Sequence, residues 1–347
     1  MTVPPRRKVT QAHIAELAGV SQATVSLVLN GKADATSRIP DETRQRVLDV
    51  IRETTYVADP AARRLAGARN KIIGVFTYEP AFPNHSLDFY TPLLTGIEAA
   101  AEQLGCDLLM FTSAPTVDGR RRIFHSDNRL GLADGCLLLG LEMDPDELAR
   151  LVREDYPFVA VGRRDAAGVP YVGVDYAGPT ATLVRRALGL GHDRFLYLHA
   201  STHGESNIDR QNGFRDSLST SGAEYALHAT DGIDLIGAWQ VVRDFQPTVL
   251  FVESPAVAES IAEIAAAAGL SVPSDLSIVV LGEPSRLIDQ ATNFTRFSAP
   301  RIELGEKAVH LLSRILSPDD HPSSAEDRDL LPCAIVDGST LQRPAQR

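Results

Sequence analysis

Hydrophobic and polar positions divide the chain into a short helical head and a longer body in which strands alternate with helices. Over residues 10–51, apolar side chains recur three or four positions apart, which is the spacing of an amphipathic helix. From residue 72 onward, short runs of aliphatic and β-branched residues alternate with amphipathic stretches. That alternation is typical of parallel sheets with helices on both faces.

The head begins with a short helix that ends in a tight turn. Thr10 is placed to cap this helix, and Ile14 and Leu17 are among its apolar positions. Gly19 ends the helix, because glycine adopts positive φ in a turn without steric cost. The first helix is therefore expected to stop one turn before the next one begins.

Two more helices complete the head. Ser21 caps the second, whose apolar positions within 25–29 share one face, and Asn30-Gly31 ends it. Pro40 opens the third helix, which has apolar positions within 47–51. This order predicts a helix-turn-helix unit, in which the second helix enters the major groove of DNA.

The first turn of the second helix carries the side chains that suit DNA. Gln22 can pair with adenine, and Ala23 or the methyl group of Thr24 can contact a thymine methyl. Thr24 and Ser26, together with the helix N-terminus, can also hold phosphates. The alternative is a helical hairpin with no DNA function.

Charge separates the head from the body. Residues 1–70 hold 11 Lys and Arg against 7 Asp and Glu, a net charge of +4, whereas the remainder holds 23 against 38, a net charge of −15. A basic head on an acidic body indicates that the head, and not the body, meets a polyanion. A chance distribution on a solvated surface is the alternative.

Composition and motifs exclude several classes of protein. With 44% hydrophobic and 23% charged residues, the chain is ordinary for a globular protein. No run reaches the roughly 18 apolar residues of a membrane span, and MTVPPRRK does not lead into the apolar core of a signal peptide, so we expect a cytoplasmic protein with no membrane partner. The three cysteines, Cys106, Cys136 and Cys333, are far apart and are read as buried small hydrophobes.

The motifs of common enzymes and metal sites are missing as well. The sequence lacks GxSxG, GxxxxGK[ST], GxGxxG and HExxH, so neither catalysis nor a cofactor is expected. His199 and His203 lie four positions apart at the end of a predicted strand with no evident third ligand, which does not indicate a metal site.

The body contains enough strands for two sheets. Strands are predicted at 72–78, 106–113, 135–141, 158–163, 194–200, 248–254 and 276–282, and helices at 91–104, 146–154, 178–190, 209–220, 236–245 and 256–268. The two sheets are expected on either side of about residue 175. Open α/β sheets bind ligands at the carboxyl ends of their strands, so a ligand is expected in the cleft between two lobes.

The sequence of the head resembles a known family. VTQAHIAELAGVSQATVSLVLNG, followed by TRQRVLDVIRETTYVADPAARRLAG, resembles the headpiece and hinge of the LacI/GalR family of bacterial transcription regulators. The resemblance implies a small all-α helix-turn-helix domain followed by a two-lobed α/β domain of the periplasmic-binding-protein type I. The boundaries implied are 1–57 for the headpiece, 58–70 for the hinge helix and 71–347 for the effector and dimerisation domain. Within that domain one lobe takes about 71–174 and 300–325, and the other about 175–299 and 326–347.

In that family a leucine of the hinge helix wedges into the minor groove, and the matching residue is Leu65. The alternative is a plain linker helix. The DNA-binding residues predicted are Thr10, Ser21, Gln22, Ala23, Thr24, Ser26, Asn30, Arg63, Arg64 and Leu65. The sequence departs from the family pattern at Leu27, where an arginine is frequent, and at Ala58 and Asp59 before the hinge helix.

The resemblance continues more loosely through the body, in GHDRFLYL, DRQNGF, VGVDY, FSAPRIELGEKAVHLL and LPCAIVDGST. Arg210 matches the pocket arginine that binds effector oxygens, although an arginine at the surface of a helix is the alternative. Arg163 follows a strand, where a solvated loop is the alternative. The effector-binding residues predicted are Asp88, Phe89, Tyr90, Arg163, Asp175, Tyr176, Arg210, Ser254 and Glu283.

Three departures concern the expected sugar site. Ser254-Pro255 replaces an asparagine-aspartate pair, Gly282 replaces a later aspartate, and Asp337 replaces a late arginine. Glu253 and Glu283 remain as substitute acceptors. The function predicted is a homodimeric repressor that binds a palindromic double-stranded DNA operator and is controlled by a small effector, a sugar or a related metabolite. A solute-binding protein without DNA function is the alternative, and an α/β enzyme is opposed by the missing motifs.

Overall fold

The protein is described from a computed structural model, which covers residues 9–30, 39–54, 56, 69–79, 90–117, 119–230, 234–283, 292–317 and 327–345. The chain divides into two compact units, Met1–Lys71 and Ile72–Arg347. The predicted site residues that lie outside the described residues are Arg63, Arg64, Leu65, Asp88 and Phe89.

The head unit contains the three predicted helices, α1 (Gln11–Ala18), α2 (Gln22–Asn30) and α4 (Asp41–Thr54). Its buried core consists of small and β-branched side chains, namely Ile14, Ala15, Ala18, Val25, Val28 and Val47. Leu17, one of the predicted apolar positions of the first helix, lies outside this core, with 52% of its surface exposed. One turn of helix separates Leu17 from Ile14, but Ala18 takes the core position instead.

The helix ends of the head are capped by the residues that the sequence singles out. The hydroxyl of Thr10 accepts a hydrogen bond from the amide of His13 at 3.3 Å, and Gly19 has a φ of 64°. The hydroxyl of Ser21 accepts from the amide of Thr24 at 3.1 Å. A contact that the pattern did not predict comes from α4, where Nε of Arg46 donates to the carbonyl of Ala18 at 3.0 Å. These bonds satisfy backbone groups that a helix end otherwise leaves open.

The first sheet of the body has six parallel strands in the order β13-β7-β6-β5-β1-β2. They are β1 (Ile72–Thr77), β2 (Asp107–Phe111), β5 (Gly135–Leu139), β6 (Phe158–Val161), β7 (Tyr171–Val174) and β13 (Arg328–Leu331). Helices α6 (Thr91–Gln103) and α12 (Arg301–Leu316) pack on one face, and α7 (Pro145–Arg153) packs on the other. A short hairpin of β3 (Thr116–Val117) and β4 (Arg120–Arg121) and a 3-10 turn η1 (Leu130–Leu132) belong to this lobe.

The second sheet has the order β14-β12-β11-β10-β8-β9, with only β14 antiparallel to its neighbour. Its strands are β8 (Arg194–His199), β9 (Glu224–Ala229), β10 (Val249–Val252), β11 (Ser277–Val280), β12 (Thr295–Ser298) and β14 (Ala334–Val336). Helices α8 (Ala177–Gly189) and α9 (Glu205–Leu218) cover one face, and α10 (Leu235–Phe245) and α11 (Pro255–Ala267) cover the other. The two-lobed α/β architecture predicted from the sequence is confirmed.

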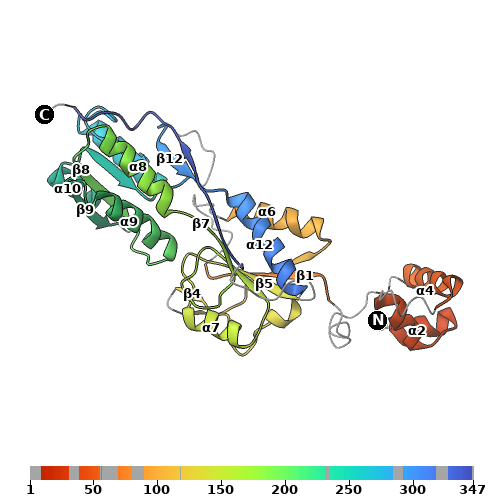
Figure 1. The fold of residues 1–347 in the computed structure, drawn as a ribbon. Helices are drawn as coiled ribbons and strands as arrows, with labels where there is room; N and C mark the ends of the chain where they lie inside the picture. The colour runs from red at the N-terminus through yellow and green to blue at the C-terminus, as the bar shows by residue number, and fades with distance from the viewer. Residues whose placement is uncertain are drawn as a thin grey trace, which may run out of the picture. The chain divides into compact units, whose positions relative to one another are not determined.

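Close helix packing holds α12, which follows the second lobe in the sequence, on the first lobe. Helices α6 and α12 lie side by side (Figure 1), and a Cβ added at Gly96 would lie 2.0 Å from the carbonyl oxygen of Ile302. A Cβ at Gly305 would likewise lie 2.3 Å from the carbonyl oxygen of Leu93. The two backbones can approach this closely only because both positions are glycine.

Some elements differ from the sequence prediction. β9 and β12 were not predicted, and α9 begins at Glu205 rather than near residue 209. β13 pairs with β7 in the first sheet, so the chain returns to the second lobe after Leu331 rather than near residue 326. The exposed residues of β13 give it a weak apolar pattern, and parallel pairing with β7 defines it.

Within the described residues, no single helix is long and apolar enough to cross a membrane. The bent pair Gln11–Ala18 and Gln22–Leu29 reaches that length and hydropathy together, with an angle of 106° between the helices. Five of the six buried core residues of the head belong to this pair, which accounts for its apolar composition.

Candidate functional site

The first turn of α2 presents a polar surface at a helix N-terminus. The hydroxyl of Ser21 lies 2.9 Å from that of Thr24 and also caps the helix, so both hydroxyls are held in place. Gln22 and Ala23 are exposed, and Thr24 and Ser26 are partly exposed. Further along the helix, Leu27 is 40% exposed. The residues predicted to face DNA therefore lie on the open side of α2, while Val25 and Val28 face the core.

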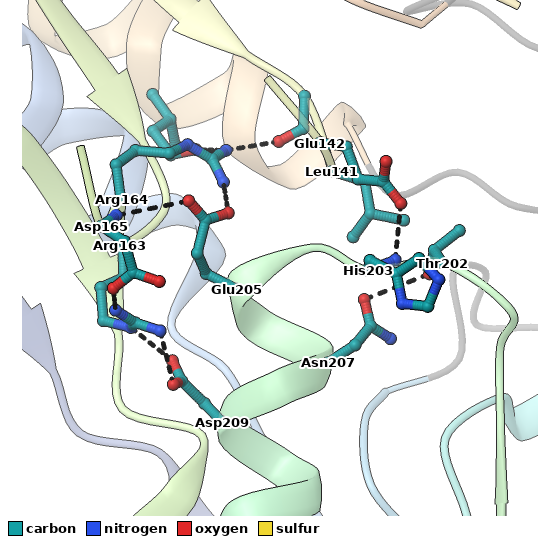
Figure 2. A network of polar contacts seen from close by, with 12 residues as sticks. Leu141, Glu142, Arg163, Arg164, Asp165, Thr202, His203, Glu205, Asn207 and Asp209 are labelled. Carbon is teal, nitrogen blue, oxygen red and sulfur yellow. Dashed lines mark hydrogen bonds and ion pairs between the residues drawn. The ribbon is translucent and has the colours of Figure 1, made fainter. Parts of the chain in front are cut away.

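Two ion pairs join the lobes of the body at the carboxyl end of β6 (Figure 2). Nε and Nη2 of Arg163 each donate to the Asp209 carboxylate at 2.7 Å. Nη1 of Arg164 donates to Glu205 at 2.7 Å, and Nη2 donates to the carbonyl of Gly140 at 2.6 Å. Asp209 and Glu205 lie on α9, so both arginines form ion pairs with this helix. The pairing with Asp209 and Asp165 raises the pKa of Arg163. Arg163 therefore does not lie in a solvated loop, which was the alternative prediction.

The backbone just before α9 also touches the first lobe. The amide of His203 donates to the carboxylate of Glu142 at 2.6 Å (Figure 2). A Cβ added at Gly204 would lie 2.5 Å from the carbonyl oxygen of Leu141. The strand ends of the first lobe and the N-terminus of α9 are therefore in direct contact.

Arg210, in the second turn of α9, is held against aromatic rings. Its guanidinium carbon lies 3.8 Å from the ring centre of Tyr176 and 5.8 Å from that of Phe297. Nε donates to the carbonyl of Leu281 at 3.1 Å, and Nη1 donates to that of Ser206 at 2.9 Å. Arg210 is thus a partly buried side chain at the carboxyl end of β11, and the alternative of an arginine on the helix surface does not fit.

Two other predicted effector residues serve as helix caps. Oδ1 of Asp175 accepts from the amide of Gly178 at 2.9 Å, at the start of α8. Oγ of Ser254 accepts from the amide of Val257 at 3.4 Å, at the start of α11. Their oxygens therefore have structural partners at the carboxyl ends of the strands. Glu283 lies 3.9 Å from Nη1 of Arg296.

Tyr90 belongs to the first lobe and is nearly buried. Its hydroxyl donates to the carboxylate of Glu79 at 2.6 Å, and burial together with that carboxylate raises the pKa of the phenol. Glu79 also accepts from the amide of Leu141 at 3.2 Å. The side chain of Tyr90 is thereby tied to the carboxyl ends of β1 and β5.

Glu253 is the centre of a network that the sequence did not fully predict. It accepts from the Tyr197 hydroxyl at 2.6 Å, from the Ala200 amide at 3.0 Å and from Nδ2 of Asn207 at 2.7 Å. Burial and the Glu253 carboxylate raise the pKa of Tyr197. Asn207, Glu205 and Asp209 were all missed, and the only available signal was their position within five residues before Arg210.

No group of three or more potential metal ligands occurs within the described parts of the chain. Nδ1 of His199 lies 2.8 Å from the carbonyl oxygen of its neighbour Ala200. His203 uses its backbone amide toward Glu142. The two histidines therefore have separate structural surroundings.

Comparison with known families matches both parts of the chain. The family described as bacterial regulatory proteins, lacI family, matches residues 11–59. The periplasmic binding protein-like domain matches residues 184–341. The two matches fall on the helical head and on the second part of the body.

Two of three curated relatives cover about nine tenths of the chain, and the third covers about three quarters. It is 28% identical over 326 residues to the HTH-type transcriptional regulator CelR of Thermobifida fusca, covering 88% of this chain and 92% of that protein. It is 25% identical over 327 residues to the catabolite control protein A of Priestia megaterium, covering 91% and 95%. The sucrose operon repressor of Klebsiella pneumoniae is 29% identical over 264 residues, covering 74% and 77%.

Solved structures show the same fold. A lac repressor dimer bound to operator and the anti-inducer ONPF aligns with a TM-score of 0.75 at 20% identity, covering 97% of this chain and all of that chain. A complex of the transcriptional regulator CelR with cellobiose aligns with a TM-score of 0.66 at 22% identity, covering 95% and 99%.

Proposed function

Because the chain belongs to the LacI family of bacterial regulatory proteins, we propose that it is a transcriptional repressor that binds a palindromic operator as a homodimer. A small-molecule effector bound between the lobes of the body controls this binding. The curated relatives are transcriptional regulators rather than enzymes, which supports this assignment. A repressor of this kind works in the cytoplasm, where the operator is.

The observation that carries the proposal is the open first turn of α2. Ser21 and Thr24 fix the helix N-terminus, and Gln22 and Ala23 extend from it into solvent. A helix presented in this way enters the major groove with its N-terminal residues against the base edges. Gln22 reads adenine there, and the exposed Leu27 offers an apolar contact to a thymine methyl instead of an arginine contact to guanine.

In a homodimer, the DNA contacts of the two protomers are related by two-fold symmetry. Two copies of α2 in successive major grooves read two inverted half-sites, which is why the operator of a two-fold dimer is palindromic. Thr10, Asn30, Arg63 and Arg64 are assigned to the same DNA interface. Between the half-sites, Leu65 of each protomer is proposed to enter the minor groove and kink the DNA.

Control by an effector rests on the contact between the lobes. Arg163, Tyr176 and Arg210 lie at the carboxyl ends of strands, where open α/β sheets bind ligands. CelR is known in complex with cellobiose, and one relative is named a sucrose operon repressor, which supports an effector of the carbohydrate class. Binding there changes how the lobes close, and that change biases the affinity for operator.

Selection of operators from random double-stranded DNA tests the proposal. The purified chain should enrich inverted half-sites and bind them with an affinity that falls steeply as salt rises. Gln22→Ala should lose about 1–3 kcal/mol of discrimination at one base pair in each half-site. Gln240→Ala is the control, because Gln240 is exposed on α10 and bonds Asp244 within that helix. Failure to enrich any sequence would favour the solute-binding alternative.

A further inference from the structure

We propose that the effector is an acid, with a carboxylate or phosphate group bound jointly by Arg121 of the first lobe and Arg210 of the second. This inference rests on the proposed function and specifies the chemical class of its effector. At the carboxyl ends of the strands, two arginine side chains have unused donors, whereas the carboxylates already have partners.

Arg121 is a cation without a carboxylate partner among the described residues. The β3–β4 hairpin leads into three consecutive arginines, of which the outer two form ion pairs, Arg120 with Glu142 and Arg122 with Asp144. Arg121 instead uses Nη1 alone, which donates to the Thr77 hydroxyl at 2.8 Å and lies 3.4 and 3.5 Å from the carbonyls of Thr77 and Glu79. Its Nε and Nη2 have no hydrogen-bond partner in the described part of the chain.

Arg210, on the other lobe, also lacks a carboxylate partner among the described residues. Its two hydrogen bonds go to backbone carbonyls, and no described carboxylate lies within ion-pair distance of it. Its Nη2 has no acceptor among the described residues. Arg163 and Arg164 on the same boundary, in contrast, each form an ion pair with an acid of α9.

The nearby carboxylates, in contrast, already have partners within the protein, Glu283 lying 3.9 Å from Nη1 of Arg296. Glu253 accepts three hydrogen bonds, Glu79 accepts from the Tyr90 hydroxyl and the Leu141 amide, and Asp175 caps α8. The positions where the family pattern places sugar-clamping side chains hold the capping Ser254 and Gly282. A neutral sugar brings hydroxyl donors that need acceptors, whereas an oxyanion brings only acceptors and charge. The surplus at this boundary is of donors, so it suits the oxyanion.

The two guanidiniums lie at carboxyl ends of strands, one in each lobe. Arg121 is bonded to the carboxyl end of β1, and Arg210 to the residue that follows β11. The first lobe meets the N-terminal part of α9 through Arg163–Asp209 and Glu142–His203, and Arg210 follows Asp209 directly. A planar guanidinium fork binds carboxylate or phosphate oxygens in pairs. An acid held by one fork from each lobe therefore stabilises closure, which is how its binding reaches the operator.

Calorimetric titration of the full chain with matched compounds tests the inference. The probes are glucose, glucuronate and glucose 6-phosphate, then galactose and galacturonate, with inorganic phosphate as the bare anion. We expect at least one acid to bind about tenfold or more tightly than its neutral counterpart, and the carboxylate and phosphate members tell the two sources apart. Arg121→Gln and Arg210→Gln should each weaken that acid about tenfold or more, and Arg210→Lys should recover part of the loss because it keeps the charge. Arg120→Gln, next to Arg121 but paired with Glu142, should leave it unchanged.

Neutral sugars that bind as tightly as the acids, or the absence of any acid binding, would refute an acidic effector, as would an acid whose affinity ignores both Arg121→Gln and Arg210→Gln. Thermal unfolding of each variant checks that it is folded. Operator binding by the unliganded wild type is measured separately. If the protein binds operator but none of the acids, only the acidic effector is refuted. If it shows no sequence-specific DNA binding, the proposed repressor function is refuted.

Discussion

The guanidinium of Arg163 crosses the boundary between the lobes and holds both carboxylate oxygens of Asp209 at 2.7 Å. Both side chains are largely buried, with 20% and 16% of their surface exposed. The same guanidinium also pairs with Asp165, whose side chain is 70% exposed. One arginine thus has a buried partner across the boundary and a solvated partner in its own loop, which allows the contribution of the boundary to be measured.

Asp209→Asn is expected to lower the free energy of unfolding by about 2 kcal/mol, because it leaves a partly buried guanidinium without its charged partner. Urea denaturation of the full chain measures the change. Asp165→Asn is the matched control and should cost less than about 0.5 kcal/mol, since exposed ion pairs contribute little. Equal effects of the two variants would show that the ion pair between the lobes contributes no more to the free energy of unfolding than the exposed ion pair does.

Gly204→Ala should hold the lobes apart. The added Cβ would lie 2.5 Å from the Leu141 carbonyl oxygen, so the backbones must separate at a cost of about 1–3 kcal/mol. We expect a larger radius of gyration by small-angle X-ray scattering and weaker effector binding. Gly189→Ala, with nothing within 4 Å of the new Cβ, is the control and should change neither. A compact Gly204→Ala protein would contradict the close approach.

Ser21→Ala removes the cap of the helix assigned to DNA recognition. The amide of Thr24 loses its acceptor, and the first turn of α2 should be destabilised by about 1 kcal/mol. Hydrogen–deuterium exchange of α2 amides should speed up about fivefold, while α4 is less affected. Ser21→Asn should restore protection, because asparagine also caps helices. Unchanged exchange in Ser21→Ala would show that the cap does not hold this turn.

Leu65→Ala tests the hinge independently of the major-groove contacts. A side chain wedged between base steps matters only where the DNA is kinked, so the variant should lose far more affinity for the selected operator than for random DNA. Fluorescence anisotropy with both duplexes at the same salt gives the two ratios. Equal losses on both duplexes would refute the minor-groove wedge.

The sequence predicted those elements whose signals are local. The caps at Thr10 and Ser21 and the turn at Gly19 depend on residues next to one another, and the structure contains all three. Most of the buried central strands were also found, because continuous apolar runs mark them, but β12, whose buried positions alternate, was not. The exposure of Leu17 was not predicted, since helical periodicity does not say how wide the apolar face of a short helix is.

The boundary between the lobes was harder to predict because its partners are distant in sequence. Arg163 was selected as an effector residue, but nothing local indicated that Asp209, 46 positions later, would neutralise it. Ser254 and Asp175 were selected from family positions, and the structure shows their oxygens capping helices. Arg121 was missed because three arginines in a row give no sign of which one has no ion pair within the described part of the chain.

His192 is a buried base near the end of the second lobe. Its Nε2 lies 2.8 Å from the Gln342 carbonyl oxygen, and its Nδ1 is buried with no hydrogen-bond partner among the residues that the structure describes. The ring also packs edge-on near Phe195, with 6.4 Å between ring centres. Burial lowers the pKa of His192, because a protonated ring would place a charge among apolar neighbours.

This lowered pKa makes the body less stable in mild acid. Below the ordinary histidine pKa of about 6.5, His192 is protonated in the unfolded chain but stays neutral in the folded chain. The free energy of unfolding therefore falls as the pH drops from about 7.5 to 5.5. His192→Gln should flatten this slope in urea denaturation, since glutamine does not titrate. The exposed His310 provides the control, and His310→Gln should keep the wild-type slope. If His192→Gln keeps the full slope as well, other groups cause the acid sensitivity and burial of His192 does not.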